Sequence, residues 1–247
     1  MYYFASDVHL GAGSAEVRQA VECNFVEWLD RAAADAEAIF LCGDIFDFWF
    51  EYKRVVPKGF VRTLGKIAQL TDRGVRVVFM SGNHDMWVLD YLEEECGMEL
   101  YTTPTTFSLA GRKVHVAHGD NLNVKGDVKL KFLNSFFRSS LARKIFRAVV
   151  HPDLALKFGL WWSDISREKH TRQPHDEQER TSLFLREYAL EHHAKSGDEV
   201  YIFGHLHYAK EYLQERPQII FMNDWSSDPH YVAIDKNGEA KLLKVND

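Results

Sequence analysis

Short apolar runs alternate with amphipathic helical patterns through the first part of the chain, and this order restricts the possible folds more than any other feature. Residues 2–6, 38–44 and 76–85 are expected to form strands, while residues 15–34 and 61–74 have the apolar spacing of helices that bury one face. Strands separated by helices form βαβ units, in which the strands pair in parallel. The sequence therefore predicts an α/β fold with a largely parallel sheet.

The later strand signals have a different character. Residues 105–120 resemble a hairpin around Ala110 and Gly111, and residues 199–207, 218–224 and 230–245 show period-two apolar patterning, the last with a Lys236-Asn237-Gly238 turn. These segments predict a second, more antiparallel sheet. The predicted class is α/β, as a four-layer α-β-β-α sandwich of two mixed sheets with a helical cap insertion.

The cap is expected in the middle of the chain. Between about residues 121 and 197 the strand signal disappears and helical periodicity takes over. No internal repeat, low-complexity tract or Gly/Ser linker marks a second independent unit. We therefore expect residues 1–247 to form a single domain, with residues 121–197 as an insertion.

Composition excludes some partners and compartments. The formal charge of −6 and the pI near 6.1 argue against a nucleic-acid-binding surface. The three cysteines, Cys23, Cys42 and Cys96, have no metal-like spacing, and an odd number suits a reducing compartment. No basic and apolar leader precedes residues 2–6, and no apolar run approaches the roughly 20 residues that span a bilayer. These features predict a cytoplasmic protein that does not cross a membrane.

Polar side chains of one chemical kind follow five of the expected strands. Carboxyl ends of strands in α/β sheets converge on one crevice, so these groups should meet there although they are distant in sequence. Their members are Asp7 and His9, Asp44 and Asp47, Asn83 with His84 and Asp85, His118, and His205 with His207.

The donor types indicate metal ions. Carboxylate, imidazole and amide donors without thiolate suit Mn²⁺, Fe²⁺ or Zn²⁺. The number of donors exceeds what one catalytic ion with an open position can use. Two ions that share a bridging carboxylate would use them all, and paired ions commonly serve displacement at phosphorus. The seven expected ligands are Asp7, His9, Asp44, Asn83, His118, His205 and His207.

Local spacing supports this interpretation. In an extended segment, residues i and i+2 point the same way, so Asp7 and His9 can bind one ion, as can His205 and His207. The glycines at positions 43, 82 and 204 would allow close backbone approach beside the ions.

The ordered motifs "DVHLG", "GDIFD", "GNHD", "HGD" and "GHLH" resemble those of the calcineurin-like metallophosphoesterase superfamily. Together with "GDIFDFW", "ECGMEL", the basic insertion and "NDWSSDPHYVAI", they are similar to the UDP-2,3-diacylglucosamine hydrolases of lipid A biosynthesis. Many of those hydrolases carry arginine where this chain has His84. A histidine at this position matches the pattern of the broader superfamily.

The resemblance implies a reaction and its participants. It implies two divalent ions, most often Mn²⁺, and cleavage of the pyrophosphate bond of UDP-2,3-diacylglucosamine to UMP and 2,3-diacylglucosamine 1-phosphate. The partner would be this UDP-linked acylated sugar, met on the inner face of the cell membrane. Two alternatives stay open: a metallophosphoesterase that acts on a soluble nucleotide or another phosphodiester or phosphomonoester, and a non-catalytic scaffold with this fold.

The resemblance also implies a role for each residue. His84 would protonate or stabilise the departing oxygen, and Asp85 would orient the His84 ring. Asp44 would bridge the ions, the first held also by Asp7, His9 and His207, the second by Asn83, His118 and His205.

The expected cap carries a basic amphipathic segment. Residues 129–150 contain six basic residues and no acidic one, with large apolar residues at helical spacing. Such a segment can lie on an anionic membrane or cover acyl chains, although a packed cap with a solvated charged face is the alternative. The expected substrate contacts are Asn83, Arg138, Arg143, Ser163 and Arg167.

Other residues are expected to be structural. Phe48 and Trp87 are predicted to be core aromatics, and His115 a half-buried structural residue. His192 and His193 are predicted to be solvated.

Overall fold

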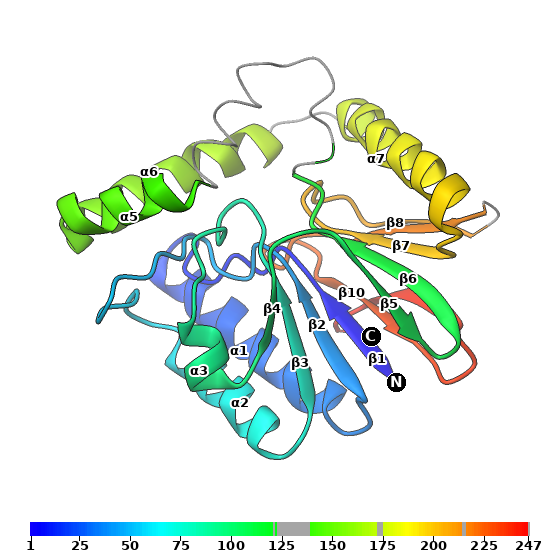
Figure 1. The fold of residues 1–247 in the computed structure, drawn as a ribbon, viewed down its shortest axis with the longest axis horizontal. Helices are drawn as coiled ribbons and strands as arrows, with labels where there is room; N and C mark the ends of the chain where they lie inside the picture. Colours follow the sequence, from blue (N-terminus) through cyan, green and yellow to red (C-terminus); the bar gives the residue numbers. More distant parts are fainter. Residues whose placement is uncertain (121, 123–138, 172–174, 214–215, 247) are drawn as a thin grey trace.

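The computed structural model describes residues 1–120, 122, 139–171, 175–213 and 216–246. The first part of the chain alternates strands and helices as predicted (Figure 1). Its elements are β1 (Tyr2–Ala5), α1 (Ala15–Ala32), β2 (Ala38–Cys42), α2 (Val61–Asp72), β3 (Arg76–Met80), α3 (Tyr91–Cys96) and β4 (Glu99–Tyr101).

The remaining elements include the cap. Among the described residues between β6 and β7 there are three helices and no strand. The elements are β5 (Thr105–Leu109), β6 (Arg112–Ala117), α5 (Ser140–Val149), α6 (Pro152–Thr171), α7 (His175–Ser196), β7 (Val200–Phe203), β8 (Lys210–Tyr212), β9 (Gln218–Phe221), β10 (His230–Ile234) and β11 (Ala240–Lys244). The single-domain organisation stays a prediction.

Two mixed sheets form the centre of the fold. The first has the order β11-β10-β1-β2-β3-β4, in which β1 to β4 pair in parallel. The second has the order β5-β6-β7-β9-β8, with a parallel centre of β6, β7 and β9 between antiparallel edges. The predicted fold class is therefore confirmed.

The closing hairpin lies in a different sheet from the one predicted. Residues 230–245 were expected in the second sheet, but β10 pairs antiparallel with β1 of the first, with Tyr2 opposite Ile234. Period-two patterning shows which residues share a face but not which strand is the neighbour. Here β10 covers the edge of β1 and turns Val232 and Ile234 into the core between the sheets.

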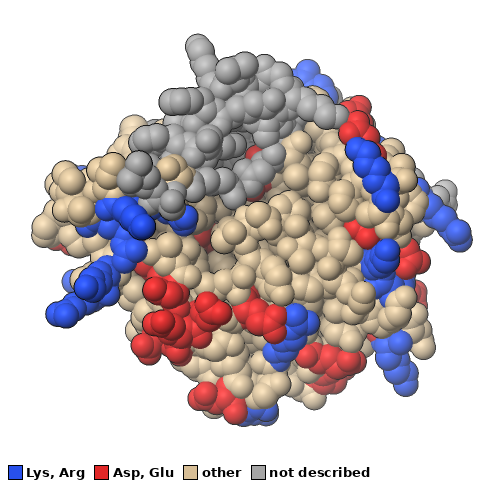
Figure 2. All heavy atoms as spheres, in the orientation of Figure 1, with Lys and Arg blue, Asp and Glu red and all other residues tan. Residues whose placement is uncertain are grey.

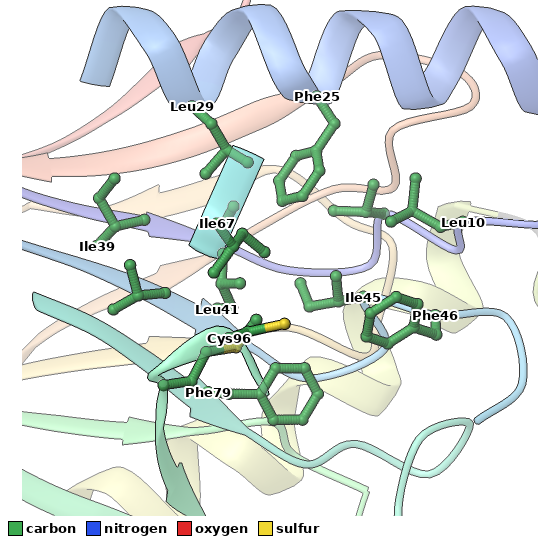
Figure 3. Packing of buried hydrophobic residues seen from close by; sticks show 14 of the residues in the cluster. Leu10, Phe25, Leu29, Ile39, Leu41, Ile45, Phe46, Ile67, Phe79 and Cys96 are labelled. Atoms are coloured by element: carbon green, nitrogen blue, oxygen red, sulfur yellow. The ribbon is translucent and has the colours of Figure 1, made fainter. Parts of the chain in front are cut away.

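Three apolar layers hold these elements together. On the outer face of the first sheet, Phe25 and Leu29 of α1 point toward Ile39 and Leu41 of β2 (Figure 3). A second cluster fills the space between the two sheets, and a third lies between the second sheet and α7. The order of layers is thus helices, sheet, sheet, helix.

This arrangement directs the strand ends toward the cap. The carboxyl ends of β1, β2 and β3 point to the side of the molecule where α5 and α6 lie (Figure 1). Gly159 of α6 rests directly on the Phe48 ring, at a distance that leaves no room for a Cβ atom. None of the described helices combines the length and the apolar character that a bilayer crossing requires.

Candidate metal centre

The loops after β1 and β2 are joined by backbone hydrogen bonds at the rim of the first sheet. The N–H of Asp7 donates to the carbonyl of Gly43 (3.1 Å), and the N–H of His9 donates to the carbonyl of Asp44 (3.0 Å). From the second sheet, the N–H of His205 donates to both carboxylate oxygens of Asp7 (3.1 and 3.0 Å). Polar residues from both sheets therefore meet in one crevice.

The first group of donors consists of Asp7, His9 and His207. The two Nε2 atoms of His9 and His207 face each other at 3.1 Å, and Oδ1 of Asp7 lies 3.4 Å from Nε2 of His207. Nitrogen lone pairs and a carboxylate oxygen that converge in this way can surround one cation. These are the residues expected to hold the first ion.

The second group contains Asp44, His118 and His205. Nε2 of His118 lies 3.2 Å from Oδ2 of Asp44 and 3.2 Å from Oδ1 of Asn83. Asp44 also belongs to a group with His9 and His84, so its carboxylate lies between the two sets of donors. This is the position that a bridging ligand requires.

The backbone of these residues is unusual. The described part of the chain contains seven non-glycine residues with positive φ, and five of them are expected ligands. Such conformations cost about 1–3 kcal/mol each and persist at functional sites, where the surrounding structure enforces them. The five are Asp7, His9, Asp44, His205 and His207, with φ between 48° and 68°.

The three predicted glycines do allow close approach. A Cβ atom at position 43 would lie 2.6 Å from Nδ1 of His118, and one at position 204 would lie 2.5 Å from Oδ2 of Asp7. At Gly82 it would overlap Oδ1 of Asp44 and lie 2.6 Å from its backbone nitrogen. Each glycine therefore leaves the space into which a donor side chain is packed.

We expect Gly82→Ala to lower the free energy of unfolding by about 1–3 kcal/mol, because the added methyl group must displace Asp44. It should also weaken metal binding by about 10–100-fold. Denaturant unfolding and equilibrium dialysis measure the two effects. Gly65→Ala is the matched control: nothing lies within 4 Å of a Cβ there, inside α2, so it should stabilise the protein by about 0.5–1 kcal/mol. Equal behaviour of the two variants would contradict the packing argument.

Electrostatics favour a positive charge in the crevice. Burial alone would raise the pKa of Asp7, but the neighbouring His207 and His118 imidazoles outweigh burial and lower it. Burial alone would lower the pKa of His118, but the Asp44 and Asp7 carboxylates outweigh burial and raise it. Burial and the adjacent charge of His118 lower the pKa of His205 to about 3. The residues thus combine ionised carboxylates with an imidazole that stays neutral, a donor set that fits divalent first-row metals.

His84 lies at the edge of this crevice. Its Nδ1 is 2.9 Å from the carbonyl oxygen of Asp47 and 2.8 Å from Oγ of Ser163. Because a carbonyl only accepts, Nδ1 carries the proton in that bond and Nε2 faces Asp44, 3.9 Å from Oδ2. Nε2 is therefore the ring nitrogen available to the reaction.

Asp85 has a different place from the one expected. Its carboxylate accepts hydrogen bonds from the N–H groups of Gly82 (2.7 Å), Ile45 (2.9 Å) and Phe46 (3.4 Å). The expected contact with the His84 ring is replaced by the Asp47 carbonyl and Ser163. Burial, followed by the negative charge of Asp44, raises the pKa of Asp85 to about 7. Asp85 thus joins the two loops that carry Asp44 and Asn83.

The residues expected to contact substrate are only partly brought together. Asn83 lies in the crevice, and buried Ser163 of α6 donates to Oδ1 of Asp47 (2.5 Å). Arg143 lies on α5, and its Nε has no hydrogen-bond partner among the described residues. Arg138 and the side chain of Arg167 lie outside the described residues.

An apolar pocket opens beside His84 and Asn83. Its walls come from the core loops and from the cap, and aromatic rings dominate them. Phe48 and Trp87 were expected to be core residues, but both belong to this lining. Their positions next to the second and third motifs could have indicated that they lie near the site. The lining residues are Phe48, Trp49, Asn83, His84, Met86, Trp87, Phe146, Phe158, Gly159, Trp162 and Ser163.

Comparisons with known proteins identify the family of this chain. The family model described as calcineurin-like phosphoesterase matches residues 2–209. A UDP-2,3-diacylglucosamine hydrolase of Porphyromonas gingivalis is 36% identical over 235 residues, which cover 90% of this chain and 89% of that one. The enzyme of that name from Haemophilus influenzae strain KW20 is 25% identical over 246 residues, 98% of each chain.

Among solved structures, an archaeal phosphodiesterase aligns over 98% of each chain with 13% identity and a TM-score of 0.47. The matched family model spans all five motifs, and the structure gathers His or Asp side chains from each of them into metal-site clusters. The chain belongs to the calcineurin-like phosphoesterase family and is a metal-dependent phosphoesterase.

Proposed function

We propose that this enzyme hydrolyses the pyrophosphate bond of UDP-2,3-diacylglucosamine to UMP and 2,3-diacylglucosamine 1-phosphate. It would use two divalent metal ions for this reaction, and we propose that they are Mn²⁺. The observation that carries the proposal is the aromatic pocket that begins at His84 and Asn83. A diacylated sugar needs an apolar surface next to its phosphates, and a soluble nucleotide does not. The relatives that bear this name, at 25–36% identity over most of the chain, support the same substrate.

The residues divide the work at the phosphate. Asp7, His9 and His207 would hold one ion, and Asn83, His118 and His205 would hold the other, with Asp44 available to both. Bound ions would supply Lewis-acid chemistry, polarising the phosphate and lowering the pKa of a nearby water. With protons on both ring nitrogens, His84 would deliver the Nε2 proton to the departing oxygen, while the Asp47 carbonyl and Ser163 accept hydrogen bonds from its Nδ1–H. Ser163 therefore acts on substrate through His84.

The cap supplies the surface for the acyl chains. Phe146 of α5 packs against Phe50 and Trp87 of the core, with ring centroids 5.1 and 5.2 Å apart. Phe158 and Trp162 of α6 line the pocket, yet they are 47% and 48% exposed. Large aromatic side chains this exposed beside a catalytic crevice suit a lipid substrate.

The same helices favour contact with the membrane that contains such a lipid. The described residues of α5 include Arg143, Lys144 and Arg147 and no acidic residue, while Ile145 and Val149 of this helix are exposed. Figure 2 shows Lys and Arg side chains gathered at the left of this face, with a group of acidic side chains just below them. We infer peripheral binding to the inner face of the cell membrane, with the enzyme otherwise in the cytoplasm.

The substrate assignment is tested by a direct comparison. Purified enzyme with Mn²⁺ is assayed on UDP-2,3-diacylglucosamine in detergent micelles and on bis-p-nitrophenyl phosphate. Release of UMP with a much higher kcat/KM for the lipid supports the proposal. Efficient turnover of soluble diesters without UMP release would instead favour the soluble-substrate alternative.

The pocket is tested by a matched pair of tryptophans. Trp162→Ala should lower kcat/KM for the lipid by about tenfold or more, because the acyl chain loses an apolar contact, and should leave bis-p-nitrophenyl phosphate turnover unchanged. Trp161, the 56% exposed neighbour on α6, is outside the pocket lining and serves as control. An equal loss in Trp161→Ala would show that the pocket is not where the lipid binds.

A further inference from the structure

A second cluster of metal-type donors lies on the outer face of the second sheet. His115 comes from β6, His192 from the last turns of α7, and Asp198 from the turn before β7. One donor atom from each lies within 4.8 Å of the others. None of the three belongs to the expected ligand set of the crevice, so the phosphoesterase reaction gives this cluster no role.

The distances have the dimensions of a coordination shell. Oδ2 of Asp198 lies 3.5 Å from Nδ1 of His115 and 3.4 Å from Nδ1 of His192. Zinc–ligand bonds of about 2.0–2.1 Å in a tetrahedron place neighbouring donors roughly 3.3–3.4 Å apart. The imidazole-to-carboxylate distances in the catalytic crevice are similar, at 3.2 and 3.4 Å.

The charges around Asp198 call for a cation. The residue is only 2% exposed, and within the described part of the chain its ion-pair partners are the two imidazoles. A buried carboxylate without a compensating charge is costly, and neutral imidazoles are ready ligands.

Neighbouring hydroxyl groups complete the surroundings. Oγ1 of Thr106 donates to Oδ2 of Asp198 (2.7 Å), and the hydroxyl of Tyr188 lies 3.1 Å from Nε2 of His115. A hydrogen bond at the ring nitrogen opposite the ligand atom orients a metal-binding histidine. The His192 side chain is 31% exposed, which provides a route for an ion from solvent.

We propose that His115, His192 and Asp198 form an additional Zn²⁺ site that ties the end of α7 to the second sheet. Two imidazole nitrogens and one carboxylate oxygen are a donor set that zinc accepts, with water or the Tyr201 hydroxyl, 3.0 Å from Nδ1 of His192, as a fourth ligand. The ion would be structural, because it joins two elements that meet at the end of the cap insertion.

Zinc stoichiometry tests the site. Full-length wild type and His192→Gln are dialysed to equilibrium against Zn²⁺, and bound zinc is counted by mass spectrometry. The variant should bind one equivalent less, while its Mn²⁺-supported turnover of bis-p-nitrophenyl phosphate stays unchanged. His193→Gln is the matched control, since His193 is the next residue of α7 and its Nδ1 donates to the backbone carbonyl of Asp198 (2.7 Å), not to its carboxylate.

Equal zinc content in wild type and His192→Gln would overturn the proposal, as would an equal loss in His193→Gln. Asp198→Asn is the second variant: it keeps the size of the side chain and should also bind one equivalent less. The same difference should appear in an Asp44→Ala background, where fewer catalytic ions are bound. If the catalytic assignment is wrong, wild type should still bind one equivalent of zinc more than His192→Gln. If the additional zinc site is wrong, this difference should vanish while the phosphoesterase activity remains.

Discussion

Asp44→Ala is expected to reduce turnover by about a thousandfold or more and to lower the metal bound in the crevice from two equivalents to one or none. Asp44 is shared by two donor groups, and its Oδ2 lies 3.2 Å from Nε2 of His118. Its loss therefore removes a ligand from both ions at once, and about 4 kcal/mol of transition-state stabilisation corresponds to that factor. Single-turnover kinetics with bis-p-nitrophenyl phosphate and metal analysis of the dialysed protein measure both effects.

A second buried carboxylate provides the control. Glu51 is 2% exposed and accepts hydrogen bonds from Nε1 of Trp49 and the N–H groups of Asp90 and Tyr91. Glu51→Gln should lower stability and leave metal content and kcat near the wild-type values. If Asp44→Ala kept both ions, the bridging assignment would be wrong.

His84→Ala is expected to slow turnover by on the order of 100-fold while both ions stay bound. His84 is 8% exposed, its Nδ1 is occupied by Asp47 and Ser163, and its Nε2 faces the crevice. Removing the ring takes away the proton donor for the departing oxygen. A substrate with a more acidic leaving group needs less protonation, so the loss should shrink with bis-p-nitrophenyl phosphate relative to an alkyl phosphodiester.

Metal analysis separates the two possible roles of His84. The ring also lies within one donor group with His9 and Asp44, so a ligand role would appear as a lost equivalent of metal. Ser163→Ala is the companion variant, because it removes one hydrogen bond from Nδ1 and keeps the ring. Its effect on kcat should be smaller, and a larger effect than that of His84→Ala would contradict the proposed order of roles.

The sequence predicts much of this molecule because its main signals are local. The five motifs each follow a strand, and the carboxyl ends of strands converge, so the positions of Asp7 and His118 in one crevice could be expected. The sheet that receives residues 230–245 could not, because alternation is the same whichever edge a strand joins. The face of the sheet to which each side chain points was predictable, but the strand beside which each strand lies was not.

The fine contacts show the same division. The role of Asp85 was expected from its position beside His84, whereas the chain turns its carboxylate toward the N–H groups of Gly82 and Ile45. His192, expected in solvent, meets His115 and Asp198 because α7 packs on the second sheet. Such side-chain contacts depend on how a helix is rotated about its own axis. The sequence does not define this rotation for α7, because the helix is only weakly amphipathic.

The metal-donor side chains of the crevice come from both sheets. Asp7 and Asp44 follow strands of one sheet, and His118 and His205 follow strands of the other, all but His118 with left-handed backbone. A chain whose halves have not yet docked presents neither set in the right geometry. Ions bound in the crevice would therefore stabilise the docked arrangement of the two sheets, and removal of metal should lower the free energy of unfolding.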